Sequence, residues 1–240
     1  RDDVHAILDA GLADATTPRL WRADEGPSVT VDGHDVAAIE GKPVFFLGLR
    51  KVPKPVAPFD APAQWLPTCV FLDPETLQCR VHDAETYPEE CAAYPGSNLA
   101  LGAETECERV EDAMGGDRLL DPDPPDGADD LLVGPQAVGQ KVFVYPDPDA
   151  LTGVVDRVLA GALTPADRAQ FVAAAAAGSP GTTAIDRAHF DRALETAREA
   201  DSWAGRAIDD WRERADTDAP DPALGRVVEA ERGAPDTPGW

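Results

Sequence analysis

The 240-residue chain is strongly acidic, yet it contains enough apolar sequence to form a hydrophobic core. Asp and Glu number 45 against 21 Lys and Arg, giving a formal net charge of −24, while apolar residues make up 43% of the chain. This balance argues against nucleic acid and anionic membranes as partners, because both attract clustered Lys and Arg, and the longest apolar run, Phe171 to Gly178, is too short to cross a bilayer.

Residues 1–120 are predicted to form a small α/β part. Asp3–Leu12 has apolar residues at helical spacing. Residues 28–31 and 36–39 alternate on either side of Asp32-Gly33, which is typical of a β-hairpin. Val44–Leu47 is typical of a buried strand.

The next stretch, Arg50–Pro67, contains five prolines. Proline lacks the backbone N–H that a sheet requires, so an extended chain without regular ladder pairing is expected here. A short helix is predicted around Pro88–Ala93, inside the segment that holds the cysteines.

Residues 121–146 are predicted to be an acidic linker followed by a strand. Asp121–Gly127 is rich in Asp and Pro, as linkers and exposed loops are. Lys141–Tyr145 alternates as a strand and is expected to pair with the N-terminal sheet.

Residues 147–240 are predicted to form a mainly helical part. Asp147-Pro148 and Thr164-Pro165 each combine an N-cap residue with a proline in the first helical turn. Ile185–Ala215 is predicted to be one long helix, and the chain from Asp216 onward is expected to be a frayed acidic tail. The fold class expected for the whole chain is therefore α+β.

All four cysteines lie between positions 69 and 107, with the spacing Cys69-x9-Cys79-x11-Cys91-x15-Cys107. Three explanations remain open at this point. Four thiolates can complete a tetrahedral zinc site or hold an iron–sulfur cluster. Two disulfides would need an oxidising compartment, and no export signal is present. The third explanation is four unrelated buried thiols.

The residues around three of these cysteines carry a family resemblance. Cys69-Val70-Phe71-Leu72, Cys79-Arg80-Val81-His82 and Pro88-x2-Cys91-x2-Tyr94-Pro95 follow one another. This pattern resembles the YkgJ-type cysteine-cluster family, described as zinc- or iron-chelating proteins. The resemblance implies metal ligation by Cys69, Cys79 and Cys91, and Cys107 resembles a later cysteine of some members. The family has a basic residue where this chain has Tyr87, which alters the local charge.

The first cysteine motif of that family is absent from this sequence. Asp3–Leu8 resembles the helix that follows it, and the chain begins with Arg1 rather than Met. We therefore expect the motif either to have been lost or to lie upstream of Arg1. His82, at an aromatic position of the pattern, is interpreted as a packing residue, with metal ligation or a second-shell role as the alternative.

These observations predict a metal-binding protein with zinc as the cofactor, or an iron–sulfur cluster as the alternative. The sequence identifies no catalytic residue, since nucleotide-binding and nucleophile motifs are missing. Two other functions remain open: an iron–sulfur redox protein, and an interaction module whose C-terminal helices bind a protein partner. The expected location is a salt-rich cytoplasm.

The expectation of high salt rests on the type of charged residue. Asp outnumbers Glu by 30 to 15, and Arg outnumbers Lys by 17 to 4. Self-repulsion at this net charge destabilises the compact state, and salt screens it because the Debye length falls to ~3 Å at molar ionic strength.

The composition thus predicts a salt-dependent fold. Transfer from molar KCl to salt-free buffer is expected to unfold the protein or to lower its melting temperature by about 10 °C or more, as a loss of several kcal/mol would. Circular dichroism melts across a salt series measure this. A full melting temperature and compact fold without salt would contradict the prediction.

Overall fold

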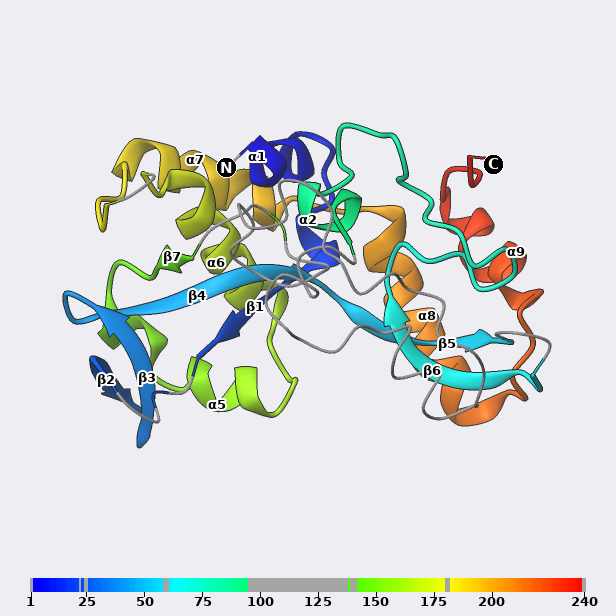
Figure 1. Ribbon diagram of the computed structural model, residues 1–240, viewed down its shortest axis with the longest axis horizontal. Helices are drawn as coiled ribbons and strands as arrows, with labels where there is room; N and C mark the ends of the chain where they lie inside the picture. Colours follow the sequence, from blue (N-terminus) through cyan, green and yellow to red (C-terminus); the bar gives the residue numbers. More distant parts are fainter. Residues whose placement is uncertain are drawn as a thin grey trace.

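The computed structural model describes residues 2–21, 23, 26–57, 61–94, 138, 142–179 and 182–238 (Figure 1). Its helices are α1 (Asp2–Asp9), α2 (Glu89–Ala92), α5 (Val154–Leu159), α6 (Pro165–Ala177), α7 (Arg187–Arg198), α8 (Trp203–Thr217) and α9 (Leu224–Val228). Its strands are β1 (Thr16–Leu20), β2 (Ser28–Val31), β3 (His34–Ile39), β4 (Lys42–Leu49), β5 (Lys51–Val56), β6 (Gln64–Cys69) and β7 (Phe143–Val144). Short 3-10 turns η1 (Ala13–Ala15), η4 (Pro148–Leu151) and η5 (Ala230–Arg232) complete the described elements. The fold is α+β, as predicted.

The larger sheet has the order β1-β4-β3-β2, with β7 also paired to β4. The predicted hairpin is confirmed as β2 and β3, and its turn places Asp32 and Gly33 at φ values of 53° and 78°. Such a turn matches the right-handed twist of the two strands. The predicted strand at 141–145 is confirmed as β7, which aligns Phe143 with Phe45 of β4.

Strands β5 and β6 form a second, two-stranded antiparallel sheet, so the prediction that Arg50–Pro67 lacks ladder pairing was wrong. The register places Pro53 opposite Pro67 and Pro55 opposite Trp65. These pairs are two residues apart, and opposite pairs alternate between hydrogen-bonded and non-hydrogen-bonded. The prolines therefore fall on the pairs that need no N–H.

Helix α6 runs through the centre of the core. It contacts β1, β4, β7, α1 and α7, and the alanines from 173 to 177 are almost fully buried. Small side chains let these neighbours approach closely, while Phe171 supplies the bulk, with its ring centroid 5.0 Å from those of Phe45 and Tyr145. Among the described helices, none is both long and apolar enough to span a bilayer.

The prediction of one long helix over Ile185–Ala215 was wrong, because α7 and α8 are separate. Ser202 caps α8 by accepting a hydrogen bond from the Gly205 N–H at 3.0 Å. Its own N–H donates to Asp14 Oδ2 at 3.0 Å, across 188 residues of sequence. A local cap and a distant partner therefore meet at the residue where α8 begins.

The tail also differs from expectation. Beyond Asp216 the chain forms α9 and η5, and Glu229 is fully buried. The predicted linker at 121–127 lies outside the described residues.

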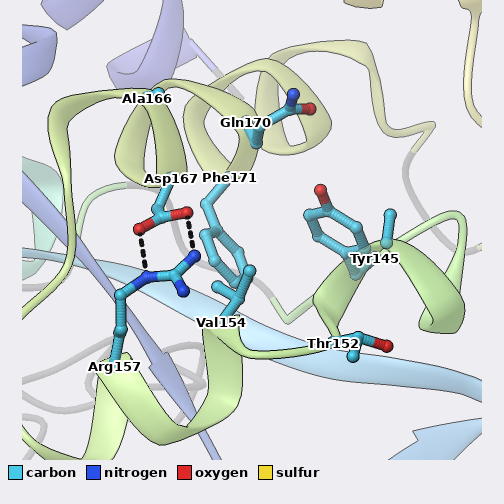
Figure 2. Close-up of a pocket in the computed structure, with 9 residues that line it drawn as sticks. Tyr145, Thr152, Val154, Arg157, Ala166, Asp167, Gln170 and Phe171 are labelled. Atoms are coloured by element: carbon cyan, nitrogen blue, oxygen red, sulfur yellow. Dashed lines mark hydrogen bonds and ion pairs between the residues drawn. The ribbon is translucent and has the colours of Figure 1, made fainter.

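Helix α6 begins at the N-cap predicted at Thr164, and there the structure forms a full capping box with Asp167. The Asp167 N–H donates to Thr164 Oγ1 and the Thr164 N–H donates to Asp167 Oδ2. Arg157 makes two further hydrogen bonds to the Asp167 carboxylate, at 2.8 and 2.7 Å, at the wall of a pocket that Tyr145 and Phe171 also line (Figure 2). The Arg157 hydrogen bond, with the Thr164 groups, lowers the pKa of Asp167 to about 2.

We predict that Asp167→Asn destabilises the protein at neutral pH by about 2 kcal/mol. Because the folded-state pKa is depressed, the carboxylate stabilises the fold above pH 3.8, and the contribution disappears as the pH falls toward 2. Chemical denaturation at pH 7, 5, 4 and 3 measures this. The exposed Asp191→Asn is the matched control, and an unchanged gap between wild type and Asp167→Asn from pH 5 to 3 would contradict the prediction.

Candidate metal site in the cysteine segment

Three of the four predicted ligands lie in the described part of the chain, in one segment after β5. Cys69 ends β6 opposite Lys51. Cys79 pairs with Leu72 in an isolated antiparallel bridge, and Cys91 lies in α2. All three are of intermediate exposure and pack against the hydrophobic core. Cys107 lies outside the described residues.

Two of the thiols have shifted pKa values. Burial raises the pKa of both, that of Cys69 to about 11. The backbone amide of Phe71 opposes this effect at Cys69, and the amides of Val81 and His82 oppose it at Cys79. The His82 N–H itself donates to the Cys79 carbonyl oxygen at 3.2 Å. Hydrogen bonds from N–H groups favour the thiolate form, which is the form that binds metals.

The thiols lie in electrostatic range of one another. The Cys79 thiol contributes to the raised pKa of Cys69. Burial, then Cys91 and Cys79, raise the pKa of the Tyr87 hydroxyl to about 12. Tyr87 therefore lies near both Cys79 and Cys91, and its Oη donates to the Cys91 carbonyl at 3.2 Å.

His82 packs against this tyrosine. The two ring centroids are 4.9 Å apart, and His82 Nδ1 is 3.1 Å from Asp83 Oδ2. These contacts agree with the interpretation of His82 as a packing residue. Within the described ranges, no three His, Cys, Asp or Glu side chains are gathered closely enough to hold a metal ion.

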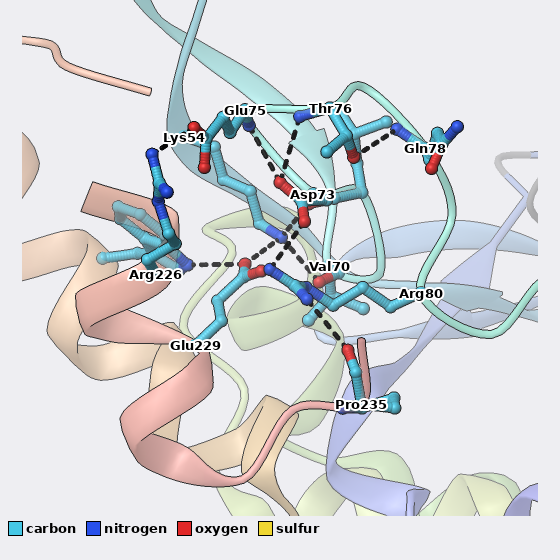
Figure 3. Close-up of polar contacts among 12 residues, drawn as sticks. Lys54, Val70, Asp73, Glu75, Thr76, Gln78, Arg80, Arg226, Glu229 and Pro235 are labelled. Atoms are coloured by element: carbon cyan, nitrogen blue, oxygen red, sulfur yellow. Dashed lines mark hydrogen bonds and ion pairs between the residues drawn. The ribbon is translucent and has the colours of Figure 1, made fainter. Parts of the chain in front are cut away.

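A network of buried charged side chains packs against the cysteine segment (Figure 3). The Lys54 ammonium is fully buried, donates to the carbonyl oxygens of Val70 and Leu72 at 2.7 and 2.6 Å, and forms an ion pair with Glu229. Burial lowers the pKa of Lys54, while Glu229 and the Cys69 thiol oppose this shift. Lys54 thus fixes the chain between Cys69 and Asp73.

Arg80 extends the network to the C-terminal segment. Its Nε donates to Glu229 Oε2 at 2.6 Å, its Nη2 lies 2.9 Å from Asp73 Oδ2, and its Nη1 donates to the Pro235 carbonyl at 2.9 Å. The other Glu229 oxygen accepts from Trp211 Nε1 at 3.0 Å. One buried carboxylate therefore joins β5, the cysteine segment and α8.

Helix α9 sits directly on the loop between the first two cysteines. A Cβ added at Gly225 would lie 2.7 Å from Pro74 Cγ, so only glycine permits this approach. Arg226 also forms an ion pair with Glu75 of the same loop.

Sequence reasoning missed Lys54 and Glu229, because a lysine among prolines and a glutamate in an acidic tail carry no local signal of burial.

A further buried acid lies beside Cys91. Glu90 is fully buried, and among the residues that the structure describes neither carboxylate oxygen has a hydrogen-bond partner. Burial raises its pKa to about 7, with Asp3 and Glu89 contributing. Proximity to other carboxylates and loss of water thus favour its protonated form.

The whole chain, residues 1–240, matches one family model, described as a family of unknown function (DUF7531). The chain belongs to this family. No curated protein and no solved structure matches it. The family match assigns no activity and does not bear on the YkgJ-type resemblance, so the function has to be argued from the site.

The network generates a prediction about stability. Glu229→Ala leaves Lys54 and Arg80 buried without their carboxylate, so we expect a loss of about 3–5 kcal/mol in the free energy of unfolding. The neighbouring Glu231→Ala removes an equal charge from an exposed position and is expected to change stability by less than about 0.5 kcal/mol. Urea denaturation of both variants at one salt concentration measures the difference. Equal values would show that the network contributes nothing.

Proposed function

We propose that this protein binds a metal through clustered cysteine thiolates, with Cys69, Cys79 and Cys91 joined by Cys107. Zinc is the expected metal, because four thiolates complete its tetrahedral shell. An iron–sulfur cluster is the alternative, because it takes the same ligands.

The observation that carries the proposal is that the backbone brings Cys69 and Cys79 together. Cys79 pairs with Leu72 in an antiparallel bridge, and the Leu72 N–H donates to the Cys69 carbonyl oxygen at 3.0 Å. The amides of Phe71 and Val81 favour the thiolate forms of Cys69 and Cys79, and the thiolate is the form that binds metals.

The buried network gives this pair a rigid base. Lys54 binds the carbonyl oxygens of Val70 and Leu72, which lie on either side of Phe71 in the chain. A metal site built on locked backbone groups keeps its ligand geometry. Binding requires Cys91 to approach Cys79, since the described residues do not yet bring three ligands together.

The role that suits such a site is structural. With four thiolates the coordination shell is closed, whereas a catalytic zinc keeps one position open. The metal would join β6, the Cys79 bridge and α2, and would contribute its binding free energy to folding. In this proposal the cysteine segment is the metal-stabilised part of the α+β fold, and the C-terminal helices support it.

We predict one equivalent of zinc without a visible absorption band in protein purified anaerobically at high salt. Cys79→Ser is expected to lose most of the metal and to melt at a lower temperature. Thr76→Ser changes the same loop but keeps the hydroxyl that accepts the Gln78 N–H, so it is the matched control and should retain the metal. Elemental mass spectrometry and absorption spectra provide the readout.

The outcomes separate the alternatives. Iron with labile sulfide and a visible band would identify a cluster protein instead of a zinc protein. Absence of metal in the wild-type protein, with all four thiols titrating as free or disulfide-bonded, would overturn the proposal. Full metal retention in Cys79→Ser would remove Cys79 from the ligand set.

A further inference from the structure

A pocket lies between α5, the N-terminal half of α6 and the segment that follows β7 (Figure 2). Its volume is about 280 Å³, and it is partly open to solvent. Sites for drug-sized ligands have volumes of about 300–1,000 Å³, so this pocket suits a somewhat smaller molecule. It shares no residue with the cysteine segment, and the metal proposed there does not involve it.

The two charged side chains in the pocket wall, Arg157 and Asp167, neutralise each other. Arg157 Nε and Nη2 donate to the two oxygens of the Asp167 carboxylate at 2.8 and 2.7 Å. The Thr164 N–H donates to Asp167 Oδ2 at 2.9 Å. A cation would therefore find no free carboxylate in this wall, and an anion would find no unpaired guanidinium. The lining favours a ligand without net charge.

Tyr145 presents a hydroxyl group to the pocket. Its ring is fixed by Phe171 and Phe45, with centroid distances of 5.0 and 6.5 Å, and only 4% of the residue is exposed. The hydroxyl points toward the side of the pocket formed by α6 (Figure 2), and it forms no hydrogen bond with any residue that the structure describes. Burial, and then neighbouring carboxylates, raise its pKa to about 12. The hydroxyl is therefore protonated at neutral pH and can donate as well as accept.

The lining holds two further polar groups with capacity for hydrogen bonds. Thr152 Oγ1 donates its hydrogen to the Asp149 carbonyl at 2.9 Å, which leaves its lone pairs able to accept. The Gln170 amide has no hydrogen-bond partner within the described ranges, and it offers both donors and an acceptor. Val154 adds apolar surface. The pocket therefore combines donors, acceptors and a partly apolar wall without a net charge.

We propose that this pocket binds a small neutral molecule with several hydroxyl groups, a polyol or a monosaccharide. A hydroxyl group both donates and accepts hydrogen bonds, so it matches Tyr145, Thr152 and Gln170 whichever role each side chain takes. The carbon skeleton of such a molecule provides apolar contact with Val154. A chain with a formal net charge of −24 also repels anions, which further favours a neutral ligand.

The test is saturation-transfer NMR on the full-length protein in molar KCl, with glycerol, myo-inositol and glucose as neutral probes. Gluconate and glucosamine serve as charged relatives of these probes. We expect saturable binding of at least one neutral probe, and weaker binding of both charged molecules than of that probe. Failure of all three neutral probes to saturate the protein, or equal affinity for a charged molecule and the best neutral probe, would overturn the proposal.

Tyr145→Phe locates the binding in this pocket. It removes the hydroxyl and keeps the packed ring, so we expect an unchanged melting temperature and an affinity for the neutral probe that falls about fivefold, as the loss of one hydrogen bond predicts. Tyr94→Phe removes a hydroxyl outside the pocket and is the matched control, which should bind like wild type. Equal affinities in these two variants contradict a role for the Tyr145 hydroxyl.

Gln170→Leu gives a second, independent measurement on the α6 side of the pocket. It removes the amide and keeps a side chain of similar size, and it is expected to weaken binding. Gln64→Leu makes the same change at an exposed position of β6 and should leave the affinity unchanged. Wild-type affinity in both Tyr145→Phe and Gln170→Leu would place any binding outside this pocket and so reject the proposal.

Discussion

The arrangement of the described chain depends on the ion pairs that the buried Glu229 carboxylate makes with Lys54 and Arg80. The carboxylate pairs with Lys54 of β5 and Arg80 of the cysteine segment, and it accepts a hydrogen bond from Trp211 of α8. Two buried cations on one buried anion are stable only when their remaining donors are also satisfied. Here they are, because the free donors of Lys54 and Arg80 bind carbonyl oxygens and Asp73.

This requirement has a consequence for the cysteines. Lys54 holds the two carbonyls that flank Phe71, and Arg80, next to Cys79, is held by Asp73 and Glu229. The backbone around Cys69 and Cys79 is therefore positioned by the charged network and not by the thiols themselves. The network also explains why the C-terminal segment lies beside a segment that precedes it by 149 residues.

Local signals predicted much of the fold, and contacts between distant residues account for what was missed. The Asp32-Gly33 hairpin and the Thr164 capping box follow from residues within one turn. The start of α8 at Ser202 combines a local cap with a contact to Asp14, 188 residues away. The pairing of β5 with β6 follows from a register that places prolines at compatible pairs. The proximity of the four cysteines in the chain can be read from the sequence, whereas the burial of Lys54 and Glu229 has no local signature.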